Sequence, residues 1–199
     1  MGQLWEAVIC KQDTNGLEDC RFFSPRCVWT SDGKHIAIGA KLLEHAWIGN
    51  PFCLAIENIL YQSTHRVLWL GEYTSEQEMK EFAEAAGSAP IPSKAPKGDS
   101  CRITFSPNEF DICGKFLVNH SAKEYVDVGK YVERLAEIDS GVIDPLPLLT
   151  ATSNDRGGGD YFGSKGRKFI GSWAWHFLSV EDEAPSGSKE IRPLFVDDI

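Results

Sequence analysis

The chain has 199 residues but no apolar run of the roughly 18 residues that a membrane-spanning helix needs. It also lacks an excess of basic residues, because 29 Asp and Glu against 20 Lys and Arg give a formal net charge of -9. Nucleic-acid binding depends on gathered Lys and Arg that neutralise phosphates. These two absences predict that neither a membrane nor a nucleic acid is the partner.

Motifs that assemble a catalytic or metal centre are missing as well. The six cysteines and five histidines show neither CxxC nor HxxxH spacing, so we expect no metal. The glycines match neither a P-loop nor the GxGxxG fingerprint of dinucleotide-binding proteins, so no cofactor is expected. Whether the protein is an enzyme stays open at this stage.

The N-terminus, Met1–Glu6, has no basic start, no apolar core and no cleavage site of a secretory signal. We therefore expect the protein in the reducing cytoplasm. Cysteines there are usually free and, when buried, behave as small hydrophobic residues. The sequence thus predicts free thiols and no disulfide framework, although the role of the six cysteines stays open.

The composition is that of a folded, soluble protein, with 42% hydrophobic and 25% charged residues. Segment 87–100 carries three prolines without periodicity and is expected to be a linker or a long surface loop. It would separate an N-terminal α+β half (1–86) from a β-rich C-terminal half (101–199) that contains a glycine-rich loop. A single domain that spans both halves is the alternative.

Capping residues followed by apolar stripes predict two helices. Asn50 and Pro51 suit the start of the first helix. Its apolar positions, at helical spacing, are Phe52, Ala55, Ile56, Ile59 and Leu60. Ser75 and Glu78 have the spacing of a capping box at the start of the second helix, and Gly87 is expected to end it.

The remaining elements are mostly strands. Short runs rich in β-branched and aromatic residues lie at 4–10, 27–30, 35–38, 66–70, 101–105, 116–119, 125–128 and 173–178. A short third helix is expected at 131–138. Two prolines predict an extended edge segment at 143–149, and the acidic stretch after 181 is typical of a solvated tail with a docking segment at Pro193–Val196. We predict an α+β fold, a mostly antiparallel mixed sheet with two or three packed helices.

Three consecutive glycines between charged residues indicate a shaped loop. Glycine adopts positive φ angles and lets a ligand approach the backbone closely, and backbone N–H groups with nearby cations can hold phosphate or carboxylate. The residues of this expected ligand or partner site are Asn154, Asp155, Arg156, Gly157, Gly158, Gly159, Asp160, Lys165 and Arg167. The alternative is a hairpin loop in which Asp155 and Asp160 bond their own backbone.

Aromatic and histidine side chains add three candidates. Trp173 and Trp175 alternate along a predicted strand, so we expect them on one face, where they would line a groove beside the glycine loop. His45 lies close before a helix start and is the candidate for acid–base chemistry. The alternatives are that both tryptophans belong to the core and that His45 is a structural residue near a helix cap.

Three stretches resemble segments of uncharacterised bacterial proteins: Lys41–Asn50, Leu117–His120 and the run from Pro145 to Tyr161 that contains Gly157–Gly159. The resemblance implies a bacterial or phage source. It carries over no functional residue.

Two functional hypotheses follow. The first is a cytoplasmic protein-interaction module, such as an immunity or accessory protein, whose acidic surface binds a basic partner protein. The second is a small enzyme or binding protein for an anionic metabolite or nucleotide that uses the glycine-rich loop. A structural component of a larger assembly is a third alternative.

Overall fold

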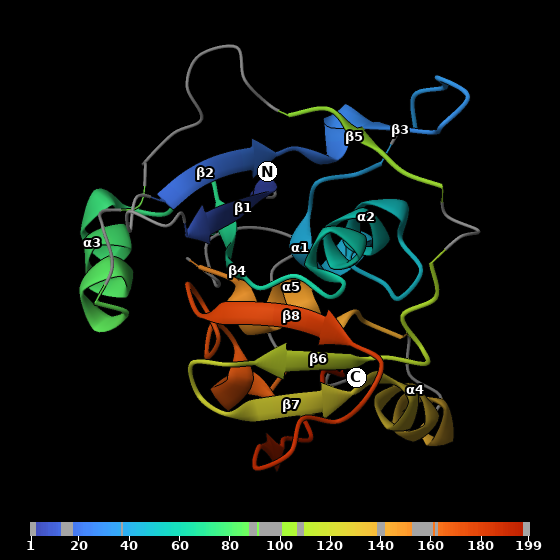
Figure 1. Ribbon diagram of the computed structural model, residues 1–199, viewed down its shortest axis with the longest axis vertical. Helices are drawn as coiled ribbons and strands as arrows, with labels where there is room; N and C mark the ends of the chain where they lie inside the picture. Colours follow the sequence, from blue (N-terminus) through green and yellow to red (C-terminus); the bar gives the residue numbers. More distant parts are fainter. Residues whose placement is uncertain are drawn as a thin grey trace.

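A seven-stranded sheet in the order β2-β1-β4-β8-β6-β7-β9 forms the centre of the molecule (Figure 1). The computed structural model describes residues 3–12, 18–36, 38–87, 91, 101–106, 110–138, 142–152, 161 and 163–196. The strands are β1 (Trp5–Gln12), β2 (Glu18–Phe23), β4 (His65–Gly71), β6 (Phe116–Asn119), β7 (Glu124–Asp127), β8 (Phe177–Glu181) and β9 (Lys189–Glu190). A second sheet pairs β3 (Val28–Trp29) with β5 (Ile103–Thr104) in parallel.

Neighbouring strands of the large sheet are antiparallel, except for the parallel pair β7 and β9. Together with the helices, this pattern confirms the predicted α+β class. The strand β4, which lies before segment 87–100, pairs with β8, which lies after it. Strands from both halves of the chain therefore belong to one sheet.

Helices with local start signals form where the sequence predicts them. In α2 (Pro51–Leu60), the Asn50 side chain accepts hydrogen bonds from the backbone N–H groups of Phe52 and Cys53. In α3 (Glu76–Ala85), Ser75 and Glu78 form the predicted capping box. The third predicted helix is α4 (Val128–Glu137), and a short helix α1 spans Leu42–His45. None of the helices in the described ranges is long and apolar enough to cross a membrane.

The two faces of the sheet bury separate hydrophobic clusters, because side chains alternate along a strand. In β1, Ile9 belongs to the larger cluster, to which α2 contributes Phe52 and Ile56. Val8 and Cys10 face the other way, into a smaller cluster that α3 completes. A helix therefore covers part of each face.

The segment predicted to be extended at 143–149 is instead helical, as α5 (Pro145–Thr150). Both prolines lie in its first turn, where backbone N–H groups need no partner within the helix. Asp144 caps this turn, since its Oδ1 accepts from the N–H of Leu146 at 2.9 Å. The sequence-based prediction took the missing N–H groups of the two prolines as a sign of an extended edge segment. The first turn of a helix does not use these donors either.

The predicted strand at 173–178 begins only at Phe177. Gly171 and Trp175 both have positive φ angles, of 68° and 63°, and the chain before β8 forms turns instead. As a result Trp173 packs into the larger cluster and Trp175 into the smaller one, and neither is exposed. The expectation that the two tryptophans share one face and line a groove is wrong.

The described part of the tail, residues 182–196, ends in a buried segment instead of a solvated one. It contributes β9, and Ile191, Pro193, Phe195 and Val196 are buried. The expected docking segment 193–196 is therefore packed against its own chain, because its apolar residues find a binding site there.

Cys10 and Cys20 form a disulfide, against the expectation of free thiols. The two residues are directly opposite each other in the antiparallel pair β1–β2. Cys27, Cys53, Cys101 and Cys113 are free. The sequence could not show this bridge, because cysteine spacing alone does not establish the register of two strands.

Candidate functional site

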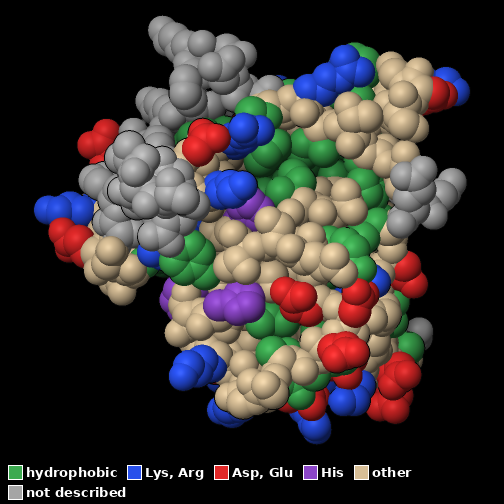
Figure 2. All heavy atoms as spheres, viewed as in Figure 1, with side chains coloured by type: hydrophobic (Ala, Val, Ile, Leu, Met, Phe, Trp, Pro, Cys, Tyr) green, Lys and Arg blue, Asp and Glu red, His purple; other side chains and the backbone are tan. Residues whose placement is uncertain are grey.

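A pocket of about 440 Å³ opens on the face of the sheet that carries α2. We call it the cationic pocket. Strands β1, β2 and β4 contribute Ile9, Lys11, Asp19, Arg21, Phe23 and His65, and the other lining residues are Ile59, Arg102, Ile103 and Thr104. Figure 2 shows a hollow in the upper half of the molecule, where hydrophobic side chains lie beside Lys, Arg and His side chains.

Strand periodicity explains how the lining residues come together. Ile9 and Lys11 are two residues apart on β1 and share one face, as do Asp19, Arg21 and Phe23 on β2. The register places Ile9 opposite Arg21 and Lys11 opposite Asp19. Buried apolar side chains thus form the floor of the pocket, while charged side chains of the same strands form its rim.

The rim is positively charged in a chain whose net charge is -9. Its cations are Lys11, Arg21 and Arg102, against the single carboxylate of Asp19. Arg21 and Asp19 approach to 3.3 Å, but both side chains are about two-thirds exposed, at 63% and 68%, so this ion pair contributes little to stability. The guanidinium of Arg102 lies 4.3 Å from the centre of the Trp29 ring, which holds it at the rim through a cation–π contact.

His65 is the most buried ionisable group of the pocket, with 9% of its surface exposed. Its Nε2 lies 2.8 Å from Ser63 Oγ, whereas Nδ1 has no hydrogen-bond partner in the part of the chain that the structure describes. Burial and, secondarily, the charge of Lys11 lower the pKa of His65. A bound anion would raise that pKa again, because it favours the protonated imidazole.

This arrangement suits binding better than reaction. Guanidinium groups hold phosphate or carboxylate through paired hydrogen bonds, and the apolar floor can take up a hydrophobic part of the same ligand. Among the lining residues, Thr104 carries the sole hydroxyl group and no cysteine is present.

The expected glycine-loop site is only partly covered by the structure. Residues 154–160 lie outside the described residues. Lys165 and Arg167 are exposed in the turn that leads into the 3₁₀ helix Arg167–Phe169, and neither lines the cationic pocket. Of the predicted site residues that the structure describes, none lines the cationic pocket.

His45 lies outside the cationic pocket and makes contacts of a structural kind. Its Nδ1 accepts a hydrogen bond from the backbone N–H of Lys41 at 3.2 Å, and its carbonyl accepts one from the Asn50 side chain. Glu44 pairs with the Lys41 ammonium at 2.7 Å, not with the imidazole. These contacts favour the structural alternative for His45.

A second group of ionisable residues is enclosed in the core. Glu57 on α2 and Asp144 at the start of α5 are fully buried and adjacent. Neither oxygen of Glu57 nor Asp144 Oδ2 has a hydrogen-bond donor among the described residues. Two carboxyl groups can hydrogen-bond to each other only when one of them holds a proton. Burial raises the pKa of both groups, that of Asp144 to about 7. The charge of Asp144 raises the pKa of Glu57 further, whereas the hydrogen bond from Glu57 lowers the pKa of Asp144.

Sequence reasoning missed both groups of residues. A signal existed for Glu57, a carboxylate one turn after Cys53 in a helix whose other residues, apart from Asn58, are apolar. No signal indicated its contact with the residue that caps α5. For the pocket, the signal was the alternation of apolar and charged residues in β1 and β2. Within the described ranges, no three His, Cys, Asp or Glu side chains gather as a metal ion would require.

Comparisons with models of protein families, with curated proteins and with solved structures find no match to this chain.

Proposed function

We propose that this protein binds a small anionic molecule with an apolar part, such as a nucleotide, in the cationic pocket. The observation that supports this most is the local excess of cations over an apolar floor in an acidic protein. An average surface patch of a chain with a net charge of -9 would carry more carboxylates than cations. A volume of about 440 Å³ is also within the range of small-molecule sites, about 300–1,000 Å³.

The ligand chemistry follows from the donors. Two arginines and a lysine favour a phosphate or carboxylate group, and Ile9, Phe23 and Ile103 provide contact for a ring or chain attached to it. This is the second hypothesis from the sequence, but the proposed ligand site lies at the sheet and not at the glycine-rich loop.

Binding of AMP, adenosine and inorganic phosphate, measured by calorimetry at low salt, tests the proposal. AMP should bind at least about tenfold more tightly than either fragment, because only AMP engages both the rim and the floor. Lys11→Ala and Arg21→Ala should each weaken AMP binding about five- to twentyfold, since a hydrogen bond to a charged group contributes about 1.5–3 kcal/mol before solvent screening. Added salt should weaken binding further.

Arg192→Ala is the matched control. Arg192 is an exposed cation outside the pocket, paired with Glu190 at 2.9 Å, and its removal should leave AMP binding unchanged. Equal losses in the control and the pocket variants would indicate a general charge effect and contradict the proposal. The same conclusion would follow if no phosphorylated ligand bound at all.

A second candidate function is the interaction of a bacterial or phage protein with a basic partner protein in the bacterial cytoplasm. The specific feature that favours it is an open hollow beside β8 that is lined by His120, Glu181, Asp182 and Glu183. The carboxylate of Asp182 is already engaged by Lys115 at 2.6 Å, which leaves Glu181 and Glu183 as the acidic groups for a partner. Pull-down from a bacterial host at low salt tests this candidate; recovery of the same partner by Glu181→Gln/Glu183→Gln protein would argue against this surface.

A further inference from the structure

The disulfide lies directly behind the cationic pocket. Cys10 stands between Ile9 and Lys11, and Cys20 stands between Asp19 and Arg21. All four of these neighbours line the pocket on one face of the sheet. Because side chains alternate, both sulfur atoms lie on the opposite face, with the smaller hydrophobic cluster.

The bridge joins β2 to the rest of the sheet within the part of the strand that lines the pocket. The strand β2 is at the end of the strand order and pairs only with β1 among the described strands. The Cys10–Cys20 pair is in register between the pairs Ile9–Arg21 and Lys11–Asp19. Without the covalent bond, the backbone hydrogen bonds of β2 and the buried rings of Phe22 and Phe23 would hold Arg21 opposite β1. Edge pairs held in this way open more readily than central ones.

The two residues of the bridge differ in their accessibility to a reductant. Cys20 is half-buried, whereas Cys10 is fully buried. Arg66 is the partner of Cys10 on β4 and therefore lies on the same face of the sheet. Its guanidinium extends away from the bridge, toward the Trp175 carbonyl oxygen. Thiol–disulfide exchange at the more accessible Cys20 releases Cys10 as the leaving group.

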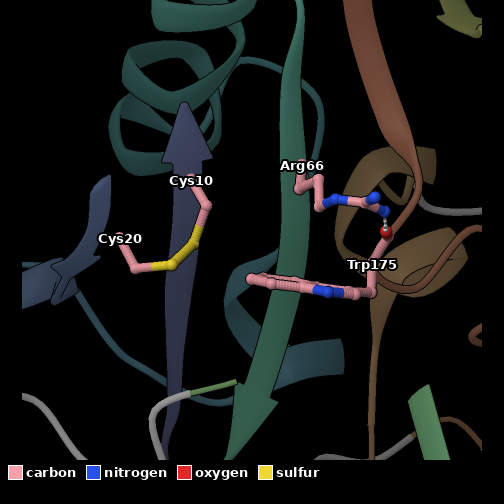
Figure 3. Close-up of a disulfide and its surroundings, with 4 residues drawn as sticks. All are labelled: Cys10, Cys20, Arg66 and Trp175. Atoms are coloured by element: carbon pink, nitrogen blue, oxygen red, sulfur yellow. Dashed lines mark hydrogen bonds between the residues drawn. A yellow bond between two sulfur atoms is a disulfide. The ribbon is translucent and has the colours of Figure 1, made fainter. Parts of the chain in front are cut away.

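Figure 3 shows how the surroundings of the bridge are held. The Trp175 ring extends across β4 toward the two sulfur atoms, and Arg66 Nη1 donates to the Trp175 carbonyl oxygen at 2.9 Å. Trp175 and Cys10 belong to the same hydrophobic cluster. The bridge therefore lies close to a tryptophan, and the fluorescence of this tryptophan can report its reduction.

We propose that the Cys10–Cys20 bridge is a reversible redox control of the cationic pocket, in which the disulfide form holds β2 in the geometry that binds the anion. This inference rests on the proposed function. The reductant is a dithiol. One of its thiolates attacks Cys20 Sγ, the bond between the two sulfur atoms breaks, and Cys10 leaves as a thiolate and takes up a proton. The second thiolate then displaces Cys20, so that two thiols form while the dithiol becomes a disulfide.

Reduction should weaken AMP binding because the pocket loses its preorganisation. If β2 holds the binding geometry for only about a tenth to a third of the time in the dithiol form, the apparent dissociation constant rises about three- to tenfold. Linkage requires that AMP stabilises the disulfide by the same factor. A tenfold effect would lower the midpoint potential of the couple by about 30 mV at saturating AMP.

The experiment compares AMP binding to oxidised and dithiothreitol-reduced protein by calorimetry. Amide hydrogen exchange of β2 and tryptophan fluorescence are recorded on the same samples. We expect about three- to tenfold weaker binding, faster exchange in β2 and a rise in fluorescence after reduction, because a disulfide quenches a nearby indole. Cys10→Ala/Cys20→Ala protein should bind as reduced wild type does and should not respond to the reductant. Cys27→Ser/Cys113→Ser protein is the matched control and should keep the full response.

The outcomes separate this inference from the proposed function. If Lys11→Ala and Arg21→Ala weaken AMP binding but oxidised and reduced wild type bind equally, the redox control is wrong and the proposed function stands. If AMP does not bind to either form, the proposed function fails, whatever exchange and fluorescence show. A bridge that resists dithiothreitol in the folded protein would also overturn the redox control. The reduced wild type supplies the answer even if the double alanine variant does not fold.

Discussion

Phe195→Ala is expected to lower the free energy of unfolding by about 3–5 kcal/mol, the usual cost of removing a large buried aromatic side chain. Phe195 is fully buried, although it lies near the end of the chain. Its ring packs edge-on against Tyr161, with 5.6 Å between the ring centres. Urea denaturation followed by circular dichroism measures the effect.

The surroundings of Phe195 explain why so large an effect is expected from a terminal segment. The backbone N–H of Val196 donates to the Tyr161 hydroxyl at 3.2 Å, and that hydroxyl lies 2.9 Å from the Val196 carbonyl oxygen. A Cβ atom at Gly166 would lie 2.5 Å from the backbone carbonyl oxygen of Leu194 and 2.9 Å from the Phe195 ring, so the backbone of Gly166 packs directly against this segment. The site thus cannot close easily over a missing ring.

Arg192→Ala is the control for this prediction, because Arg192 is exposed and belongs to the same terminal segment. Its effect should stay within about 0.5 kcal/mol. A loss below about 1 kcal/mol in Phe195→Ala would mean that the terminal segment does not hold its place in solution, as the sequence-based expectation of a solvated tail implies.

The free energy of unfolding should fall as the pH rises from about 5 to about 8, and Glu57→Gln should make that fall smaller. In the folded protein, burial raises the pKa of Asp144 from 3.8 to about 7 and raises the pKa of Glu57 as well. Above the unfolded-state pKa values the folded protein binds more protons than the unfolded chain, so each rise in pH favours unfolding. The contribution is intact below about pH 4 and is lost as the pH passes the folded values.

The expected size is on the order of a few kcal/mol, since each pH unit over which the two states differ by one proton changes stability by about 1.4 kcal/mol. In the Glu57→Gln variant, the new side-chain amide can donate to Asp144 Oδ2, which removes the need for a shared proton. Asp144→Asn should act similarly and keep its cap on α5. Glu44→Gln, at a half-exposed carboxylate paired with Lys41, is the control. A stability profile equally steep in Glu57→Gln and wild type would rule out this account.

Elements with their signals inside a few consecutive residues could be predicted from the sequence. Asn50 and Pro51 start α2, and the Ser75–Glu78 capping box starts α3, where the structure has them. The pair β6–β7 follows from two short apolar runs across a turn. Such signals act through hydrogen bonds and rotamers between near neighbours, so they do not depend on the rest of the fold.

Local signals were misread where two rules competed. At 145–150 the two prolines argued against a strand interior, but the first turn of a helix satisfies the same residues. At 171–175 the alternation of tryptophans suggested a strand, but positive φ angles at Gly171 and Trp175 turn the chain. Packing decided the second case, because burying Trp173 and Trp175 on opposite faces of the sheet outweighs a regular local pattern.

By itself the sequence determined the α+β class, the caps of α2 and α3 and the acidic charge, all of which depend on composition or on neighbouring residues. The tertiary structure alone decided that Arg102 joins Lys11 and Arg21 at one pocket, and that Cys10 meets Cys20 behind it. It also decided that Glu57 meets Asp144. Strand register and the packing of distant segments create these contacts, and neither is written in the spacing of residues along the chain.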